Sequence, residues 1–239
     1  SQIKLITSLQ QKKYRNKLGL FVAEGPKVIN ELLAAKYELH SLFTTVEGLF
    51  VGIDFEVISD KEISKISFLK NANNSVAIFK IPLNSNSIKE GTSVVLDSIR
   101  DPGNLGTIIR LCDWFGISNL VCSLDTVDCF NPKVVQATMG SIARVNIFYS
   151  DIKEYLSKSG LPVYVGTMDG KNIYKEKLIT NSNIVLGNEA NGISKNVASL
   201  LKTKLTIPRF GPLKKTESLN VANAASIILS EFRRQSIGK

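Results

Sequence analysis

DPGNLGTIIR, residues 101–110, is the first of three polar segments in this chain that each follow a strand-like apolar run. The second is GNEANG at residues 187–192, and the third begins with SLNV at residues 218–221, downstream of the apolar run that ends at Ile207. In open α/β sheets, ligands bind beyond the carboxyl ends of the strands. We therefore expect the three segments to meet in one composite site.

Strand-like and helix-like patterns alternate regularly after residue 91, and this predicts a parallel sheet with helices on both faces. A stretch rich in Pro, Asn and Ser at residues 81–91 predicts a linker. We therefore expect two domains, at residues 1–85 and 92–239. The strands expected in the second domain lie at residues 93–97, 119–123, 145–148, 163–167, 183–186 and 204–207, and its main helices at 105–115 and 218–234.

The first domain is predicted to be a small α/β module. Gly25-Pro26 precedes a helix-like segment at residues 27–36. Proline is tolerated at the start of a helix because the first N–H groups have no partner within the helix. Strand-like runs are expected at residues 39–44, 55–58 and 75–80.

The chain carries a net charge of +9, a balance that favours a polyanionic partner. Its first 17 residues contain five cations and no acid, a pattern suited to phosphate contacts. The alternative is a solvated N-terminal arm. The cations expected to contact the phosphates of such a partner are Lys12, Lys13, Arg15 and Lys17.

Several other classes of site are disfavoured by the sequence. The three cysteines form no CxxC pair and the single histidine, His40, lies far from them, so a metal site is not expected. No apolar run approaches the roughly 18 residues that span a bilayer, so we expect no membrane partner and a cytoplasmic location. Neither a P-loop nor GxGxxG is present, which disfavours an ordinary nucleotide site.

The polar segments resemble the motifs of a known family. Residues 104–110 read Asn-x-Gly-x3-Arg, residues 186–194 read LGNEANGIS, and IP at residues 207–208 precedes SLNV. In this order they resemble the three motifs of the SpoU (TrmH-type) RNA 2′-O-ribose methyltransferases of the SPOUT superfamily. TMGS at residues 138–141 also resembles the family, and FVAEG at residues 21–25 is similar to the N-terminal substrate-binding module of many members.

This resemblance implies a fold, a cofactor and partners. The second domain is expected to contain a C-terminal trefoil knot, a feature otherwise almost absent from proteins. The knotted region would bind S-adenosylmethionine, largely through backbone groups, at Thr167, Gly187, Ile207 and Leu219. The implied substrate is ribosomal RNA, with transfer RNA as the alternative, and the implied assembly is a homodimer. A non-catalytic RNA-binding or assembly factor on the same scaffold is the remaining possibility.

The resemblance also assigns the catalytic positions Asn104, Arg110, Glu189, Ser218 and Asn220. Ribose methylation requires the 2′-hydroxyl to be positioned and to lose its proton. Because a guanidinium stays protonated, we expect Arg110 to orient the ribose-phosphate and stabilise the developing alkoxide, while water or a phosphate oxygen takes the proton. Structural alternatives exist for the other positions: Asn104 and Ser218 as helix N-caps, and Glu189 as a solvated loop acid.

One interval departs from the family pattern. The segment between Gly211 and Ser218 is longer than usual and contains two lysines, which are expected to extend the RNA surface. Arg209 stands where an apolar residue is common. It is expected to be a second phosphate contact, with a plain surface charge as the alternative.

Overall fold

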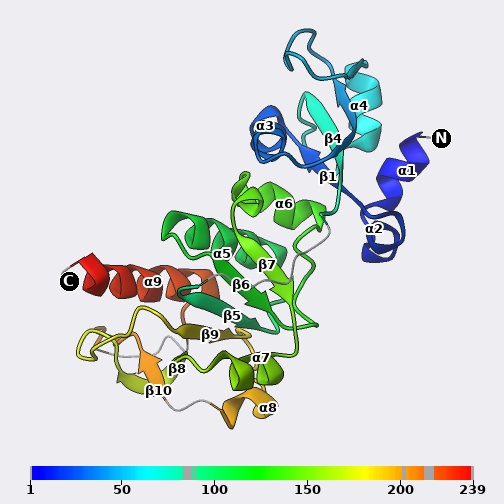
Figure 1. The fold of residues 1–239 in the computed structure, drawn as a ribbon. Coiled ribbons are helices and arrows are strands. Elements are labelled where there is room, and N and C mark those ends of the chain that lie inside the picture. The colour runs from blue at the N-terminus through cyan, green and yellow to red at the C-terminus, as the bar shows by residue number, and fades with distance from the viewer. Residues whose placement is uncertain (1, 83–87, 89, 201–202, 213–217, 238–239) are drawn as a thin grey trace. The chain divides into compact units, whose positions relative to one another are not determined.

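The computed structural model describes residues 2–82, 88, 90–200, 203–212 and 218–237. These residues form two compact units (Figure 1). The N-terminal unit consists of residues 1–85 together with the segment Asp128–Arg144, and the C-terminal unit of residues 86–127 and 145–239. From the sequence, residues 128–144 were expected to belong with the second domain; in the structure their helix, Pro132–Thr138, packs against the strand Leu20–Glu24 of the N-terminal unit.

A four-stranded sheet with the order β1-β4-β2-β3 organises the N-terminal unit. Strand β4 pairs antiparallel with both β1 and β2, and β3 extends the sheet parallel to β2. The strands are β1 (Leu20–Glu24), β2 (Leu39–Thr44), β3 (Glu56–Val57) and β4 (Ser75–Lys80), and the helices are α1 (Gln2–Ser8), α2 (Lys12–Leu18), α3 (Pro26–Ala34), α4 (Asp60–Ile66) and α6 (Pro132–Thr138).

The first 18 residues are not an extended arm but two short helices. Ile6 and Leu9 are fully buried and pack with Val22 and Ile78 of the sheet. Helix α2 ends at Gly19, which adopts the left-handed conformation (φ 65°) that glycine allows without strain. The N-terminal helices therefore belong to the core of this unit.

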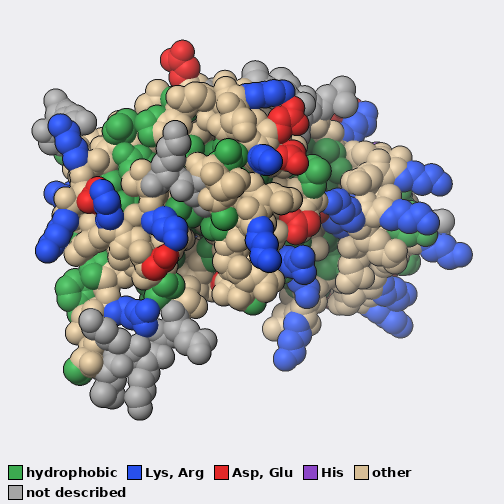
Figure 2. All heavy atoms as spheres, turned by 90° about the horizontal axis from the view of Figure 1, so that it is seen from below, with side chains coloured by type: hydrophobic (Ala, Val, Ile, Leu, Met, Phe, Trp, Pro, Cys, Tyr) green, Lys and Arg blue, Asp and Glu red, His purple; other side chains and the backbone are tan. Residues whose placement is uncertain are grey.

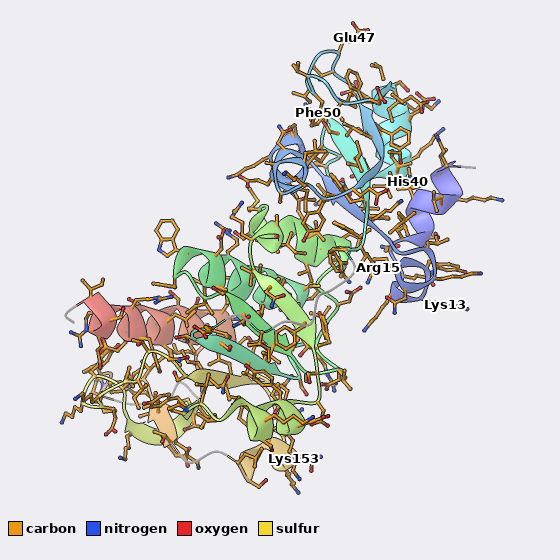
Figure 3. All side chains as sticks on the ribbon, viewed as in Figure 1. Lys13, Arg15, His40, Glu47, Phe50 and Lys153 are labelled. Carbon is orange, nitrogen blue, oxygen red and sulfur yellow. The ribbon has the colours of Figure 1, made fainter. Side chains whose placement is uncertain are left out.

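Arg15 is the side chain that joins α2 to the inserted segment 128–144. It is only 1% exposed, and its Nη2 and Nε donate to Asp128 Oδ2 at 2.6 and 2.8 Å. Its Nη1 donates to the carbonyl oxygens of Leu9 and Gln10. Figure 3 shows Lys13 on the outer side of the same helix. The expectation that Arg15 binds RNA phosphates is therefore wrong, because its donors are committed to buried protein acceptors.

The C-terminal unit is built on a six-stranded sheet with the order β10-β8-β9-β5-β6-β7, in which every pair is parallel. This confirms the predicted α/β class with a parallel sheet. The strands are β5 (Ser93–Asp97), β6 (Asn119–Cys122), β7 (Asn146–Tyr149), β8 (Val163–Asn172), β9 (Asn183–Gly187) and β10 (Thr203–Thr206), and the helices are α5 (Pro102–Trp114), α7 (Ile152–Ser159), α8 (Lys195–Ala198) and α9 (Val221–Ile237).

Helices cover both faces of this sheet, and the side-chain alternation shows why. Val165 and Val185 point to one face, where they pack with Tyr155 of α7 and Val197 of α8. The neighbouring position Tyr164 points to the opposite face and stacks edge-on against Phe232 of α9. Successive strand residues face opposite sides of the sheet. Because consecutive positions of these strands are apolar, both sides of the sheet need apolar cover.

The main differences from the predicted elements lie at helix starts and in one strand. Helix α5 begins at Pro102 rather than Leu105, α9 begins at Val221 rather than Ser218, and β8 continues to Asn172. Helices α1, α2 and α4 and strand β1 were not predicted. Within the described ranges, no helix is long and apolar enough to cross a membrane.

The Arg15–Asp128 ion pair yields a stability prediction. Replacing Arg15 by Met leaves a largely buried carboxylate without its partner, so the free energy of unfolding should fall by about 3–5 kcal/mol. Lys13→Met on the exposed side of α2 is the matched control and should change it by less than about 0.5 kcal/mol. Urea titration followed by circular dichroism measures both. Equal effects would contradict the structural role, and the Arg15→Met/Asp128→Leu pair should recover most of the loss.

Candidate active site

The carboxyl ends of adjacent strands bring the polar segments together. Strands β5 and β9 are parallel neighbours, and the last residues of the two, Asp97 and Gly187, are paired in register. The loops that follow them therefore leave the same edge of the sheet side by side. Helix α9 begins close to the second loop, because Val221 N donates to Glu189 Oε1 (3.3 Å).

Three of the predicted site residues form one hydrogen-bonded cluster. Glu189 Oε1 accepts from Asn104 Nδ2 at 2.7 Å and from Asn220 Nδ2 at 2.9 Å. Asn220 Nδ2 also donates to Asn104 Oδ1 at 2.9 Å. The structure thus joins residues from all three polar segments. We call Asn104, Glu189 and Asn220 the polar triad.

Side chains cap α5 and α9, the two helices that begin at this cluster. Asp101 Oδ1 accepts from Asn104 N (2.8 Å) and caps α5, while Asn220 Oδ1 accepts from Ala222 N (2.9 Å) and caps α9. The capping roles considered for the side chains of Asn104 and Ser218 are therefore wrong. Asn220 serves two purposes, because its oxygen holds the helix and its nitrogen holds the triad.

The loop after β9 is shaped by Asn188. Its backbone N and O exchange hydrogen bonds with Gly192, and its Oδ1 accepts from the N–H groups of Ala190 and Asn191. Gly187 must lack a side chain here, because a Cβ at that position would lie 2.6 Å from the backbone of Gly192. The tight turn fixes where Glu189 projects.

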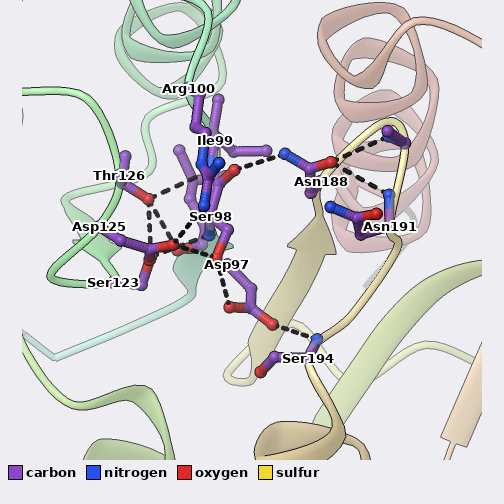
Figure 4. A network of polar contacts seen from close by, with 12 residues as sticks. Asp97, Ser98, Ile99, Arg100, Ser123, Asp125, Thr126, Asn188, Asn191 and Ser194 are labelled. Atoms are coloured by element: carbon purple, nitrogen blue, oxygen red, sulfur yellow. Dashed lines mark hydrogen bonds and ion pairs between the residues drawn. The ribbon is translucent and has the colours of Figure 1, made fainter.

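A second polar network connects this loop to β5 and β6 (Figure 4). Asn188 Nδ2 donates to the carbonyl of Ser98 at 2.8 Å, and Ser194 N donates to Asp97 Oδ2 at 2.7 Å. Ser98 holds an uncommon left-handed conformation (φ 61°). Its N–H bonds to Ser123 Oγ and its hydroxyl to Asp125 Oδ2, both within 2.8 Å.

Asp125 remains ionised through these contacts. Partial burial works to raise the pKa of Asp125, but hydrogen bonds from the Ser98 and Ser123 hydroxyls outweigh it and hold the pKa below its ordinary value. Arg100 lies 3.5 Å from the same carboxylate. Charged acceptors make the stronger hydrogen bonds, so this network is well suited to hold the strained backbone of Ser98.

A cavity of about 710 Å³ opens beside the polar triad. Its walls are mainly apolar, and the hydroxyl of Thr167 is buried in its lining. The lining residues are Gly166, Thr167, Met168, Leu186, Gly187, Asn188, Glu189, Gly192, Ile193, Leu205, Ile207, Pro208, Arg209, Phe210, Gly211, Pro212, Ser218, Leu219, Val221, Ala224 and Ile228.

Seven of the fourteen residues predicted for the site line this cavity. All four positions assigned to the cofactor line it, as do Glu189, Ser218 and Arg209. Arg110 does not: it is exposed on α5, and no hydrogen bond or ion pair of its side chain is found within the described ranges. Sequence reasoning missed the role of Asp97, although polar residues at strand ends were a usable signal. It also missed Met168 and Phe210 on the cavity wall.

The family models match both parts of the chain. The model described as the SpoU rRNA Methylase family matches residues 91–230, more than half of the sequence. The chain belongs to the SpoU rRNA methylase family. A second model, described as an MRM3-like substrate binding domain, matches residues 1–77. Both matches agree with the resemblance found in the motifs.

Relatives of this SpoU family member match along nearly its whole length. RlmP of Bacillus subtilis, named as a 23S rRNA (guanosine(2553)-2′-O)-methyltransferase, is 28% identical, covering 94% of this chain and 93% of the relative. A TrmH-family protein of Porphyromonas gingivalis has a TM-score of 0.88 at 35% identity, covering 98% and 97% of the two chains. An AdoMet-bound rRNA methyltransferase from Sinorhizobium meliloti has a TM-score of 0.85 at 31% identity, covering 97% and 94%.

The crowding at Gly187 yields a prediction for the SpoU fold. Gly187→Ala forces the Gly192 turn to shift, so the free energy of unfolding should fall by about 1–3 kcal/mol. Gly211→Ala is the matched control, since a Cβ there meets nothing within 4 Å, and it should be nearly neutral. Thermal unfolding of the two variants measures the difference. A Gly187→Ala protein as stable as the wild type would show that the close approach does not persist in solution.

Proposed function

We propose that this chain transfers a methyl group from S-adenosylmethionine to a ribose 2′-hydroxyl in ribosomal RNA. The observation that carries the proposal is the polar triad of Asn104, Glu189 and Asn220 beside the 710 Å³ cavity. Family membership supports methylation, and the full-length relatives named above as rRNA methyltransferases favour ribosomal over transfer RNA.

The cavity suits S-adenosylmethionine in size and chemistry. Small-molecule sites are commonly about 300–1,000 Å³ and mostly apolar, with a few polar groups that fix orientation. Here Thr167 contributes a buried hydroxyl, while Gly187, Ile207 and Leu219 offer backbone groups and apolar surface. When bound, the cofactor supplies an electrophilic methyl group. Thr167, Gly187, Ile207 and Leu219 are the residues proposed to hold it.

The polar triad is proposed to orient the ribose. Glu189 fixes both asparagine side chains, and its carboxylate sits at the start of α9, where the helix dipole favours negative charge. Ser218 adds a hydroxyl on the cavity wall. Because methyl transfer needs the 2′-oxygen in line with the methyl group, rigid positioning of this kind is a large part of the catalytic task.

Arg110 is proposed to act on the RNA side of the reaction. Its guanidinium has no protein partner within the described ranges, so it is available to a ribose-phosphate. A permanently charged, forked donor can orient a phosphate and stabilise the oxygen as its proton leaves. Water or a phosphate oxygen takes that proton.

The role of Arg110 yields a kinetic prediction. Arg110→Ala should lower methyl transfer to ribosomal RNA by about 100-fold or more, the usual cost of removing a donor to a developing oxyanion. Calorimetric affinity for S-adenosylmethionine and the melting temperature should stay unchanged, because Arg110 is exposed and lies off the cavity. Arg110→Lys separates charge from shape: near-normal turnover in that variant would rule out the need for a planar fork.

The N-terminal unit is proposed to bind the RNA. It matches a substrate binding domain model, and Lys12, Lys13 and Lys17 are exposed on α2. On the face drawn in Figure 2, Lys and Arg side chains are spread widely, with fewer Asp and Glu between them. Arg209 on the cavity wall is proposed as a further phosphate contact.

This assignment predicts a salt effect. Lys13→Ala/Lys17→Ala should weaken RNA binding and reduce the slope of log K against log salt by roughly 1.4–1.8, since each lost phosphate contact removes about 0.7–0.9. Lys61→Ala/Lys65→Ala removes the same charge from α4 of the same unit. Filter binding at several salt concentrations compares the two. If the pairs behave alike, only net charge matters; loss of cofactor affinity in the first pair would refute the division of roles.

Two finer features remain part of the proposal. Membership of the SpoU family supports a C-terminal trefoil knot and a homodimer. Light scattering of the purified protein tests whether it is a homodimer.

The long interval at residues 212–217 lies mostly outside the described residues. The cytoplasmic location stays a prediction.

A further inference from the structure

Phe210 is an unusual phenylalanine in this chain. The sequence contains eleven phenylalanines, of which ten are buried or half-buried, whereas Phe210 is 84% exposed. It follows β10 in a loop and lines the cavity beside the polar triad. Exposed apolar surface at the edge of a cavity commonly marks an interaction site.

The ring is part of an apolar rim. Met168 and Leu219, each 44% exposed, line the same cavity. Pro208 and Pro212 flank Phe210, and both also line the cavity. Since proline fixes φ, the loop that presents the ring loses little backbone freedom when something binds to it. Phe210 is therefore held at the cavity entrance without being covered.

The exposure of Phe210 separates it from the residues proposed to hold the cofactor. Thr167, Gly187 and Ile207 are half-buried, and Leu219 is 44% exposed, well below the 84% of Phe210. A small ligand enclosed by the cavity would contact those walls, whereas a ring that is 84% exposed faces what arrives from outside. The substrate arrives that way, because a polymer cannot enter a 710 Å³ cavity and can present only a single nucleotide at its opening.

The two sides of the opening match the two parts of a nucleotide. On one side, Glu189 and the two asparagine side chains bound to it offer hydrogen-bonding groups, which suit the hydroxyls of a sugar. Phe210 offers a flat apolar face, which suits a base. Proteins that recognise unpaired RNA commonly stack splayed-out bases on aromatic side chains.

We infer that Phe210 is the stacking platform for the base of the nucleotide whose ribose is methylated, an inference that rests on the proposed function. Phe210 is then a substrate-positioning residue. Stacking tolerates any base, so the ring contributes affinity and orientation at the target nucleotide and leaves base identity to other contacts.

Steady-state methyl transfer to ribosomal RNA transcribed in vitro tests this role. Phe210→Ala should raise KM for the RNA by about 5- to 100-fold, in keeping with the cost of removing one stacked aromatic, while the Kd for S-adenosylmethionine changes less than about twofold. Phe210→Trp should keep the wild-type KM. Tyr174→Ala is the matched control, an aromatic 46% exposed in the same unit that does not line the cavity, and it should leave KM unchanged.

Three outcomes would overturn the inference. Wild-type KM in Phe210→Ala would show that the ring contacts no substrate. A parallel loss of S-adenosylmethionine affinity would place the ring on the cofactor. Full recovery by Phe210→Leu would show that apolar surface, and not stacking, is what the site requires.

A fluorescence reporter separates this inference from the proposed reaction. Trp114 is the single tryptophan of the chain, so W114F/F210W carries its only indole at the cavity entrance. Stacking with a base should quench that fluorescence when the transcribed RNA is added. Quenching in a protein whose parent transfers no methyl group would keep the stacking role and refute the reaction. Absence of quenching in an active protein would refute the stacking role alone.

Discussion

Three segments that lie far apart in the sequence meet at one atom, Oε1 of Glu189. It accepts from the side chains of Asn104 and Asn220 and from the backbone of Val221. Hydrogen bonds to an ionised acceptor are the stronger ones, and the start of α9 adds a favourable dipole. The loop after β9 and the first turns of α5 and α9 thus share one anchor. Everything proposed for the cavity depends on that anchor, because it sets which groups face the opening.

The residues that hold Glu189 in place are polar side chains that each make more than one hydrogen bond. Asn188 shapes its own turn and reaches across to Ser98, while Asn220 caps α9 and completes the triad. Ser98 keeps its left-handed backbone because Ser123 and Asp125 hold it from the loop that follows β6. Such networks are rigid when every member is satisfied. Hydrogen bonds therefore fix the geometry of the loops that carry the triad.

Much of this arrangement could be predicted from the sequence. Alternating apolar segments gave the parallel sheet, and the rule that loops at strand carboxyl ends are neighbours anticipated the meeting of Asn104, Glu189 and Asn220. The failures have a common cause. The burial of Arg15 depends on Asp128, 113 residues away, and the N-terminal helices are stabilised by the sheet that they cover. Local patterns carry no signal for partners so distant, and they cannot decide between Ser218 and Asn220 as the cap.

The segment 128–144 makes the two units interleaved in sequence, since the chain passes between them at residues 85, 127 and 144. During synthesis, the N-terminal unit cannot be completed when its first 85 residues have emerged. At about 5–20 residues per second, α6 and the partner of Arg15 follow only seconds later. Residues 1–85 by themselves therefore lack the carboxylate of Asp128, with which Arg15 pairs in the complete unit.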